Sequence, residues 1–226
     1  MVERLLRRLR RDGLRGTLAA SVDYCLHLRR RWVDSSFDRR YGTDTQGIID
    51  DMSELGVFTE HRSNARGYEG VQIPVFRRIL RELDLVPAEY VFVDFGSGKG
   101  RALMMAAEHG FARASGVEFS PVLHRIAQEN AAAFARHHPG ACPIELHCQD
   151  ATEFSLPDEN LLCFFYNPFD DKVMRRVVAN ITDSYSKRPR KVAVAYRNPV
   201  CAELFDGLEF LRLVRVAPGY RLYRSR

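Results

Sequence analysis

A run of glycines beside an acidic residue is the part of this sequence best suited to chemistry. Asp94 stands two residues ahead of Gly96, in the run Asp94-Phe95-Gly96-Ser97-Gly98-Lys99-Gly100. Because glycine has no side chain, the backbone of such a loop can turn sharply and approach a ligand closely. Free N–H groups at the start of a following helix favour an anion or another hydrogen-bond acceptor. The Asp94 carboxylate suits an ammonium group, so we predict a loop that holds a small polar ligand.

The spacing of these glycines bears on which ligand the loop holds. A dinucleotide-binding loop requires the pattern GxGxxG, whereas the pattern that starts at Gly96 is GxGxG. A phosphate-binding P-loop requires Gly-Lys followed by Ser or Thr, but here Lys99 is followed by Gly100. Both phosphate-binding interpretations are therefore weakened, and the dinucleotide alternative stays open at this point.

Acidic residues follow the next two strands that the sequence predicts. Glu118 ends the strand expected at 114–117, and Asp150, directly before Ala151, follows the strand expected at 144–148. In open α/β sheets, ligands bind beyond the carboxyl ends of the strands. The Glu118 carboxylate can accept hydrogen bonds from both hydroxyls of a ribose, and Asp150 can accept one from the exocyclic amine of adenine. These positions predict that a nucleoside lies along this edge of the sheet.

Asn167, Pro168 and Phe169 follow the fourth expected strand and form the candidate catalytic set. An asparagine side-chain oxygen beside a rigid backbone carbonyl can accept hydrogen bonds from a substrate amine, which would direct the nitrogen lone pair toward a transferred group. Phe169 could cover the substrate or the ligand by stacking. We nominate no general base, because the candidate histidines do not stand at the carboxyl end of an expected strand. These histidines are His124, His137, His138 and His147.

Alternating strands and helices are expected to position these residues. Apolar runs predict strands, and stretches with helical spacing predict helices between them. The carboxyl-terminal runs 210–216 and 220–224 flank Pro218-Gly219, which predicts a hairpin. Repeated strand–helix units imply a three-layer, doubly wound α/β fold with a mainly parallel sheet and one antiparallel strand near its edge. The other strands are expected at 90–93, 114–117, 144–148, 161–166 and 191–196, and the longer helices at 74–84, 102–108, 121–136 and 171–185.

The first 73 residues differ from the rest and are expected to form an extension to the domain at 74–226. Within residues 1–41, leucines recur at helical spacing among arginines, which predicts a basic amphipathic helix. Such a helix can pack on its own domain or a dimer mate, contact an anionic membrane surface, or bind an acidic partner. Residues 42–73 are rich in glycine and are expected to form loops with short helices, a candidate lid over the site.

Composition narrows the class of protein and its compartment. The net charge is +5, supplied mostly by arginine, and this modest value gives little support to a nucleic-acid partner. The five cysteines form no CxxC pair, so we expect no disulfide framework, no metal site and a cytoplasmic location. Cys148 and Cys163 lie in apolar runs and are expected to be buried. No apolar run is long enough to span a membrane.

Residues 74–226 resemble the class I S-adenosylmethionine-dependent methyltransferases. The resemblance rests on the run Asp94–Gly100 as the first motif, with Glu118, Asp150 and the segment Asn167-Pro168-Phe169 at matching positions. It implies a Rossmann-like sheet of seven strands, S-adenosylmethionine as cofactor and S-adenosylhomocysteine as product. It also implies that the cofactor is bound by Asp94, Gly96, Ser97, Gly98, Gly100, Glu118, Asp150 and Ala151.

A narrower resemblance concerns the methyl acceptor. Tyr68-Glu69, together with the run Phe92–Gly98, is similar to the non-SET protein-lysine methyltransferases, which implies that Tyr68 closes over the cofactor. Asn167-Pro168-Phe169 resembles the Asn/Asp-Pro-Pro-aromatic signature of amino-group methyltransferases but lacks the second proline. We therefore expect a methyltransferase acting on an amine nitrogen of a small molecule or a protein side chain. The alternatives are a nicotinamide-dependent oxidoreductase and a non-catalytic cofactor-binding or partner-binding module; the oligomeric state stays open.

Overall fold

The computed structural model describes residues 33, 35–49 and 68–226 of the chain. The expectations for residues 1–32, including most of the basic amphipathic helix, lie outside the described residues, as do those for 50–67. Within the described ranges, residues 35–41 are helical. No helix in the part of the chain that was described is long and apolar enough to cross a lipid bilayer.

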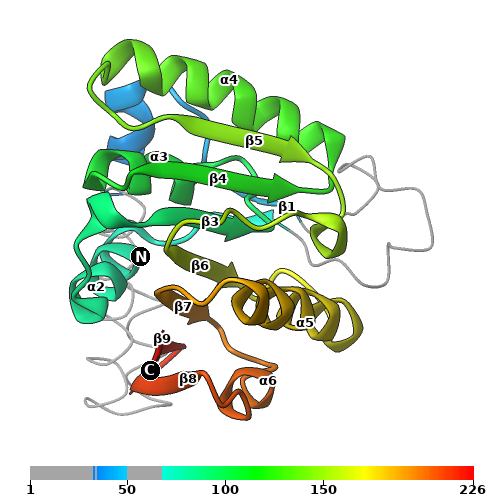
Figure 1. The fold of residues 1–226 in the computed structure, drawn as a ribbon. Helices are drawn as coiled ribbons and strands as arrows, with labels where there is room; N and C mark the ends of the chain where they lie inside the picture. Colours follow the sequence, from blue (N-terminus) through cyan, green and yellow to red (C-terminus); the bar gives the residue numbers. More distant parts are fainter. Residues whose placement is uncertain (1–32, 34, 50–67) are drawn as a thin grey trace, which may run out of the picture.

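Seven strands form the central sheet, in the order β5-β4-β3-β6-β7-β9-β8. Neighbours from β5 to β7 pair in parallel, and β9 pairs antiparallel with both β7 and β8. Figure 1 shows the parallel strands stacked beside one another with the hairpin β8–β9 at the lower edge. Chain order reverses between β3 and β6, which is where open sheets of this kind bind ligands. The strands are β3 (Val91–Phe95), β4 (Arg113–Glu118), β5 (Ile144–Cys148), β6 (Leu161–Tyr166), β7 (Val192–Arg197), β8 (Leu211–Ala217) and β9 (Tyr220–Ser225).

Helices cover both faces of this sheet. One apolar core joins the sheet to α2, α3 and α4, and a second joins the opposite face to α5 and α6. The two cores follow the period of two in a strand: Phe92 faces Phe76 of α2 on one side, whereas Phe95 stacks on Phe165 at 4.8 Å on the other. The helices are α2 (Ile73–Leu83), α3 (Arg101–His109), α4 (Pro121–His137), α5 (Asp171–Lys187) and α6 (Glu203–Asp206), with 3-10 turns η2 (Pro87–Glu89) and η3 (Ala151–Glu153).

Local sequence explains where the helices begin. Pro74 occupies the first turn of α2, where its missing N–H costs nothing. The Ser120 side chain accepts a hydrogen bond from Leu123 N at the start of α4, and Asp170 does the same for Val173 N at the start of α5. The three-layer α/β architecture, the mainly parallel seven-stranded sheet and the closing hairpin are therefore confirmed.

One expectation for local structure was wrong, and another was incomplete. The described part of residues 42–73 contains loops, as expected, and also strand β1 (Ile48–Ile49), which pairs antiparallel with β2 (Tyr68–Glu69). Cys148 was expected to be buried but is exposed, because it ends edge strand β5, which has a neighbouring strand on one side only. Cys163 in central strand β6 is buried as expected.

Candidate active site

The glycine loop joins the carboxyl end of β3 to α3. Gly96, Gly98 and Gly100 all have positive φ, at 80°, 54° and 84°, a conformation that residues with side chains rarely adopt. A Cβ on Gly96 would lie 2.5 Å from Cβ of Pro168, and one on Gly98 would collide with the ring of Tyr68. Glycine is thus required at Gly96 and Gly98, because neighbouring side chains leave no room for a Cβ atom.

A cavity of about 250 Å³ opens beside this loop. Its walls come from the glycine loop, the ends of β4 and β6, the turn η3 and the segment around β2. Every residue that the sequence predicted for the site lines this cavity except Gly100, which instead begins α3 and approaches Ala127 of α4. The lining residues from the prediction are Tyr68, Asp94, Gly96, Ser97, Gly98, Glu118, Asp150, Ala151, Asn167, Pro168 and Phe169.

Asp94 is a buried carboxyl group, 4% exposed, that faces this cavity from β3. Burial, and then the nearby charge of Glu118, raise the pKa of Asp94 to about 8. Within the described residues, no hydrogen bond or ion pair joins a donor to this carboxylate. A buried acid without a partner is costly, so a cation placed in the cavity would be attracted to it.

Glu118, the last residue of β4, is also buried and lines the same cavity. Its Oε2 accepts a hydrogen bond of 2.8 Å from Gly98 N, and its Oε1 accepts one of 2.8 Å from Ser120 N. Burial raises the pKa of this carboxyl, and the backbone hydrogen bonds partly offset that rise. Each oxygen keeps a further lone pair, so Glu118 fixes the glycine loop and can still accept bonds from a ligand.

Asp150 and Ala151 lie beyond the end of β5 at the far side of the cavity. One oxygen of Asp150 caps the turn η3 by accepting a hydrogen bond of 2.7 Å from Thr152 N. The other oxygen stays available to a ligand, while Ala151 is buried at 6% exposure. Asp150 therefore both caps the turn η3 and lines the cavity.

Asn167 stands directly after β6 with a positive φ of 42°. Its side-chain oxygen is buried and has no hydrogen-bond partner among the described residues, and the same holds for the hydroxyl of Ser97 on the glycine loop. Pro168 packs against Gly96, and Phe169 lines the cavity beside it. Two buried polar atoms without partners at one cavity mark a place where a ligand can supply the missing hydrogen bonds.

Tyr68 reaches the glycine loop from the short strand β2. Its ring lies over Gly98, its hydroxyl donates a hydrogen bond of 2.7 Å to Thr45 O, and Lys99 Nζ lies 5.5 Å from the ring centroid. Burial raises the pKa of this phenol far above its ordinary value. Tyr68 is thus a fixed, neutral wall of the cavity in this structure.

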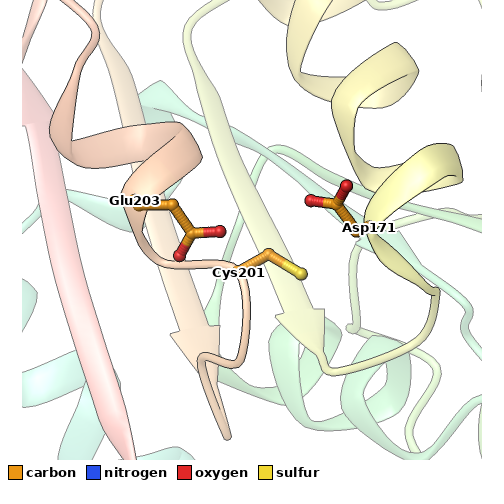
Figure 2. Close-up of side chains that lie close together, drawn as sticks. All are labelled: Asp171, Cys201 and Glu203. Carbon is orange, nitrogen blue, oxygen red and sulfur yellow. The ribbon is translucent and has the colours of Figure 1, made fainter.

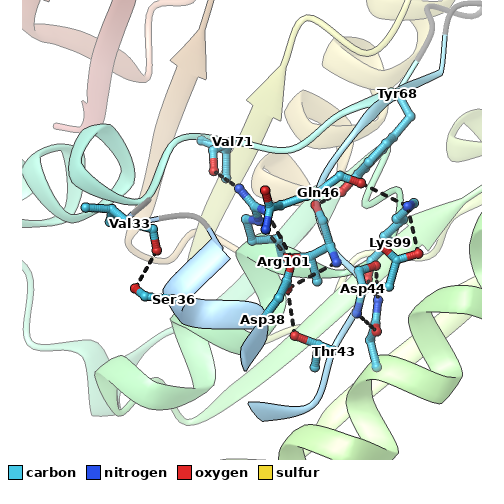
Figure 3. Close-up of polar contacts among 12 residues, drawn as sticks. Val33, Ser36, Asp38, Thr43, Asp44, Gln46, Tyr68, Val71, Lys99 and Arg101 are labelled. Carbon is cyan, nitrogen blue, oxygen red and sulfur yellow. Dashed lines mark hydrogen bonds and ion pairs between the residues drawn. The ribbon is translucent and has the colours of Figure 1, made fainter. Parts of the chain in front are cut away.

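A polar network fastens residues 38–46 to the glycine loop (Figure 3). Arg101, at the start of α3 and 3% exposed, donates a hydrogen bond of 2.8 Å from Nε to Thr45 Oγ1 and lies 3.8 Å from Asp38 Oδ2. Lys99 Nζ binds Asp44 Oδ2 at 3.0 Å and Gln46 O at 2.9 Å. The segment before β1 is therefore a structural support of the site.

Several cavity residues were missed by sequence reasoning. Asn198 follows β7 with a positive φ of 51°, and Glu69 lines the cavity next to Tyr68. Asn198 could have been found from its place after a strand that runs parallel to β6, the same signal that singled out Asn167. Arg101 gave no comparable signal, because its partners come from residues 38–45, which the sequence described only as an extension.

A second group of potential metal ligands lies outside the cavity. Figure 2 shows Asp171, Cys201 and Glu203 facing one another, with ligand atoms within 4.8 Å. The guanidinium of Arg175 donates a hydrogen bond of 2.9 Å to Asp171, and it is also attracted by the charge of Glu203. In this cluster of two exposed carboxylates and one buried thiol, Arg175 already supplies positive charge.

Comparison with known proteins decides the class of this site. Residues 92–186 match the family model of the methyltransferase domain. This segment is a methyltransferase domain. A putative methyltransferase from Escherichia coli shares the fold, with a TM-score of 0.52 and 17% identity over 70% of this chain and 89% of that one. A putative methylase from Haemophilus influenzae aligns with a TM-score of 0.52 and 13% identity over 67% and 96%. No curated protein sequence matches the chain.

S-adenosylmethionine is the cofactor of this methyltransferase, and the residues of the cavity fit it. The cofactor carries an ammonium group and a positive sulfur, and the cavity offers buried carboxylates at Asp94 and Glu118. The cofactor is rich in hydrogen-bonding groups, and two atoms of the cavity, Ser97 Oγ and Asn167 Oδ1, lack partners among the described residues. The methyltransferase expectation is confirmed, in preference to the nicotinamide-dependent oxidoreductase and the non-catalytic module.

Proposed function

We propose that this methyltransferase transfers the methyl group to an amine nitrogen, carried by a small molecule or a protein side chain. The observation that supports this acceptor is the buried, unpartnered oxygen of Asn167 at the carboxyl end of β6. An amide oxygen accepts hydrogen bonds and donates none, so it suits an acceptor atom that bears hydrogen. A nitrogen held in this way keeps its lone pair free for the incoming carbon.

The same proposal assigns the cofactor to the other walls of the cavity. Asp94 attracts the ammonium group, Glu118 accepts hydrogen bonds from the ribose hydroxyls, and Asp150 accepts one from adenine. Ser97 and the three glycines of the loop let the backbone approach the amino-acid part of the cofactor. Tyr68 covers the loop, and Ala151 packs beside the adenine.

When bound, S-adenosylmethionine supplies an electrophilic methyl carbon on positive sulfur; transfer forms the N–C bond, breaks the C–S bond and leaves the neutral thioether S-adenosylhomocysteine. The protein contributes by holding the two reactants close and in line. Asn167 orients the nitrogen, while Pro168 and Phe169 shape the surrounding wall and exclude water. An amine that enters protonated gives one proton to solvent at the open mouth before it attacks, because a protonated nitrogen has no lone pair. After transfer, the methylated nitrogen carries the positive charge that has left the sulfur.

The test combines a panel of acceptors with variants of Asn167. The enzyme is incubated with radiolabelled S-adenosylmethionine and either N-acetyl-lysine methylamide, a phenol or a thiol, and the labelled product is identified by mass spectrometry. We expect label on nitrogen, and a loss of kcat of about tenfold to a hundredfold in Asn167→Gly, which removes one charge-assisted hydrogen bond. Glycine tolerates the positive φ at this position, so backbone strain is not the cause of the loss.

Two controls keep this result interpretable. Binding of S-adenosylhomocysteine, measured by calorimetry, should stay within about twofold of wild type in Asn167→Gly, since that residue holds the acceptor. Methylation of the phenol or the thiol alone, or an Asn167→Gly variant as active as wild type, would contradict the proposal.

A further inference from the structure

We propose that Glu69 and Asn198 form an acceptor-recognition rim that selects a protonated alkylamine. The inference rests on the proposed amine acceptor and names the charge of the group that enters. Both residues are exposed and both line the cavity that also holds Asp94 and Asn167. They therefore stand at its mouth, where an acceptor passes before it reaches the cofactor.

The register of two parallel strands places Asn198 beside Asn167. Tyr166 of β6 pairs with Arg197 of β7, so the residues that follow them emerge next to each other at the carboxyl edge. Both asparagines have positive φ, at 42° and 51°, and both line the cavity. Two amide side chains thus converge from neighbouring strands on the entrance of one site.

Turn geometry alone does not account for this pair. Asparagine tolerates the left-handed conformation and often ends a strand for that reason. A turn, however, uses the backbone: Asn198 N donates to Gly219 O at 2.7 Å, and Asn198 O accepts from Val200 N at 2.9 Å. Among the described residues, no hydrogen bond joins a partner to the Asn198 side-chain amide. Those amide atoms remain available to an acceptor.

Glu69 has two polar neighbours at the mouth. Gln72 Nε2 donates a hydrogen bond of 3.1 Å to Glu69 Oε1. The phenol of Tyr166 lies close to the same carboxylate, and its pKa is raised first by burial and then by Glu69. The Glu69 carboxylate keeps further lone pairs, so it presents a negative charge to an entering group.

The charges of the cavity favour a cation over an anion. Four carboxylates line it, of which Asp94, Glu118 and Asp150 are assigned to the cofactor and Glu69 is not. Arg101 is the one Lys or Arg side chain among its described lining residues, and it is engaged by Thr45 and Asp38. Arg197 lies 5.3 Å from the Tyr166 ring and donates to Gly219 O, outside the lining. An anionic acceptor such as a phosphorylated compound would be repelled here.

The test compares two probes that differ in one charge. The enzyme saturated with S-adenosylhomocysteine is titrated with N-acetyl-lysine methylamide and, separately, with the uncharged N-acetyl-norleucine methylamide. We expect wild type to prefer the lysine probe by about fivefold, the size of an exposed ion pair. The preference should fall close to one in Glu69→Gln and should persist in Glu129→Gln, which removes an exposed carboxylate of α4 outside the cavity.

Asn198→Gly tests the second residue of the rim. This variant keeps the positive φ and removes the amide, so we expect about threefold to tenfold weaker binding of the lysine probe. Its matched control is Asp84→Gly, which changes another residue with positive φ, at 48°, in the C-cap of α2. The control should bind the probe as wild type does.

Failure of the inference and failure of the proposed function give different results. Equal binding of the two probes, no binding of the lysine probe, or an unchanged preference in Glu69→Gln would overturn the rim while the methyl-transfer assay stands. Methylation at oxygen or sulfur alone in that assay would instead overturn the amine acceptor. S-adenosylhomocysteine should bind all four variants within about twofold of wild type. A larger loss of affinity in Glu69→Gln or Asn198→Gly would place that residue in the cofactor site, and this would refute its role at the rim.

Discussion

The two ends of the parallel sheet differ in whether the protein itself supplies hydrogen-bond partners for its polar side chains. At the amino end, Arg190 precedes β7 and donates to four backbone carbonyls and to Ser184 Oγ, at 2.8–3.1 Å. Arg113, the first residue of β4, contacts both Glu145 and Glu159. At the carboxyl end, Ser97 Oγ and Asn167 Oδ1 are buried without partners among the described residues. At the amino end the protein supplies most partners itself, although Arg113 Nε has only its ion pair with Glu145 at 3.4 Å. At the carboxyl end the missing partners are ones that a ligand can supply.

The difference shows which polar residues stabilise the protein and which serve its reaction. A satisfied polar network holds strands and helices in place whether or not a ligand is present. Unsatisfied buried groups lower the stability of the empty protein and add to the affinity of the ligand that satisfies them. Substitutions at the two ends should therefore separate stability from binding.

The largest effect is expected for Gly98→Ala at the carboxyl end. The new Cβ would combine a positive φ of 54° with a collision against the Tyr68 ring, so the loop or the tyrosine must move. We expect cofactor affinity to fall by about 2–3 kcal/mol, close to a hundredfold. Calorimetry with S-adenosylhomocysteine measures it, and Gly140→Ala, where nothing lies within 4 Å of the added carbon, is the control. Equal affinity in both variants would show that the loop is not the binding element.

The next effect is expected for the two buried carboxylates. Asp94→Asn and Glu118→Gln should each weaken binding of S-adenosylhomocysteine by about 1–3 kcal/mol, the value of a charge-assisted hydrogen bond. Glu118→Gln should also lower the melting temperature, because an amide cannot accept from both Gly98 N and Ser120 N. Unchanged dissociation constants in both variants would rule out the proposed pose.

Arg190→Met should show the reverse pattern at the amino end. Removing the guanidinium takes this donor from the carbonyls of Pro157, Glu159 and Arg188, of which the bond to Pro157 is part-buried, and this costs about 1–3 kcal/mol of unfolding free energy. Chemical denaturation measures that loss, and affinity for S-adenosylhomocysteine should not change. A variant that loses affinity but keeps its stability would remove the contrast between the two ends.

The smallest change, counted per pH unit, is a pH dependence caused by Asp94. Its pKa of about 8 in the folded protein exceeds the ordinary value near 4, so its contribution to stability is present below about pH 4 and is lost as pH rises through 8. We expect the unfolding free energy of the cofactor-free protein to fall by up to about 1.4 kcal/mol per pH unit from this group. Asp94→Asn should flatten the slope.

Saturating S-adenosylmethionine should flatten that slope as well. An ammonium group beside Asp94 favours the carboxylate and lowers its pKa, so binding below pH 8 releases a proton. Affinity should then rise with pH until the carboxyl is ionised. A cofactor affinity that is independent of pH from 6 to 8 would contradict the placement of the ammonium.

The sequence predicted the sheet well because its signals are local. Central strands such as 161–166 are uniform apolar runs, and the helix starts at Pro121 and Asp171 follow capping residues, so most observed ends fall within two residues of the predictions. The ligand-facing side chains of the glycine loop, β4 and β6 could likewise be predicted, since each stands at the carboxyl end of a recognisable strand.

The remainder of the site depends on distant pairings that leave no local pattern. Glu69 reaches the cavity because β2 pairs with β1, two strands of two residues each that hydrophobic periodicity cannot detect. Cys148 looked buried because its run is apolar, but β5 is the last strand of the sheet and lacks a neighbour on one side. The position of a strand within the sheet decided its exposure, and the sequence of that strand did not reveal it.

The network joining residues 38–46 to Arg101 also has a consequence for protein engineering. A fusion or shuffled gene with its junction at residue 73, where composition changes, would separate the buried guanidinium from Asp38 and Thr45. It would also remove the amide contacts of Asn130, which binds the backbone of Asp44 in both directions. The smallest fragment that keeps these contacts therefore starts upstream of Asp38. A chimera that exchanges the glycine loop must include that upstream segment as well.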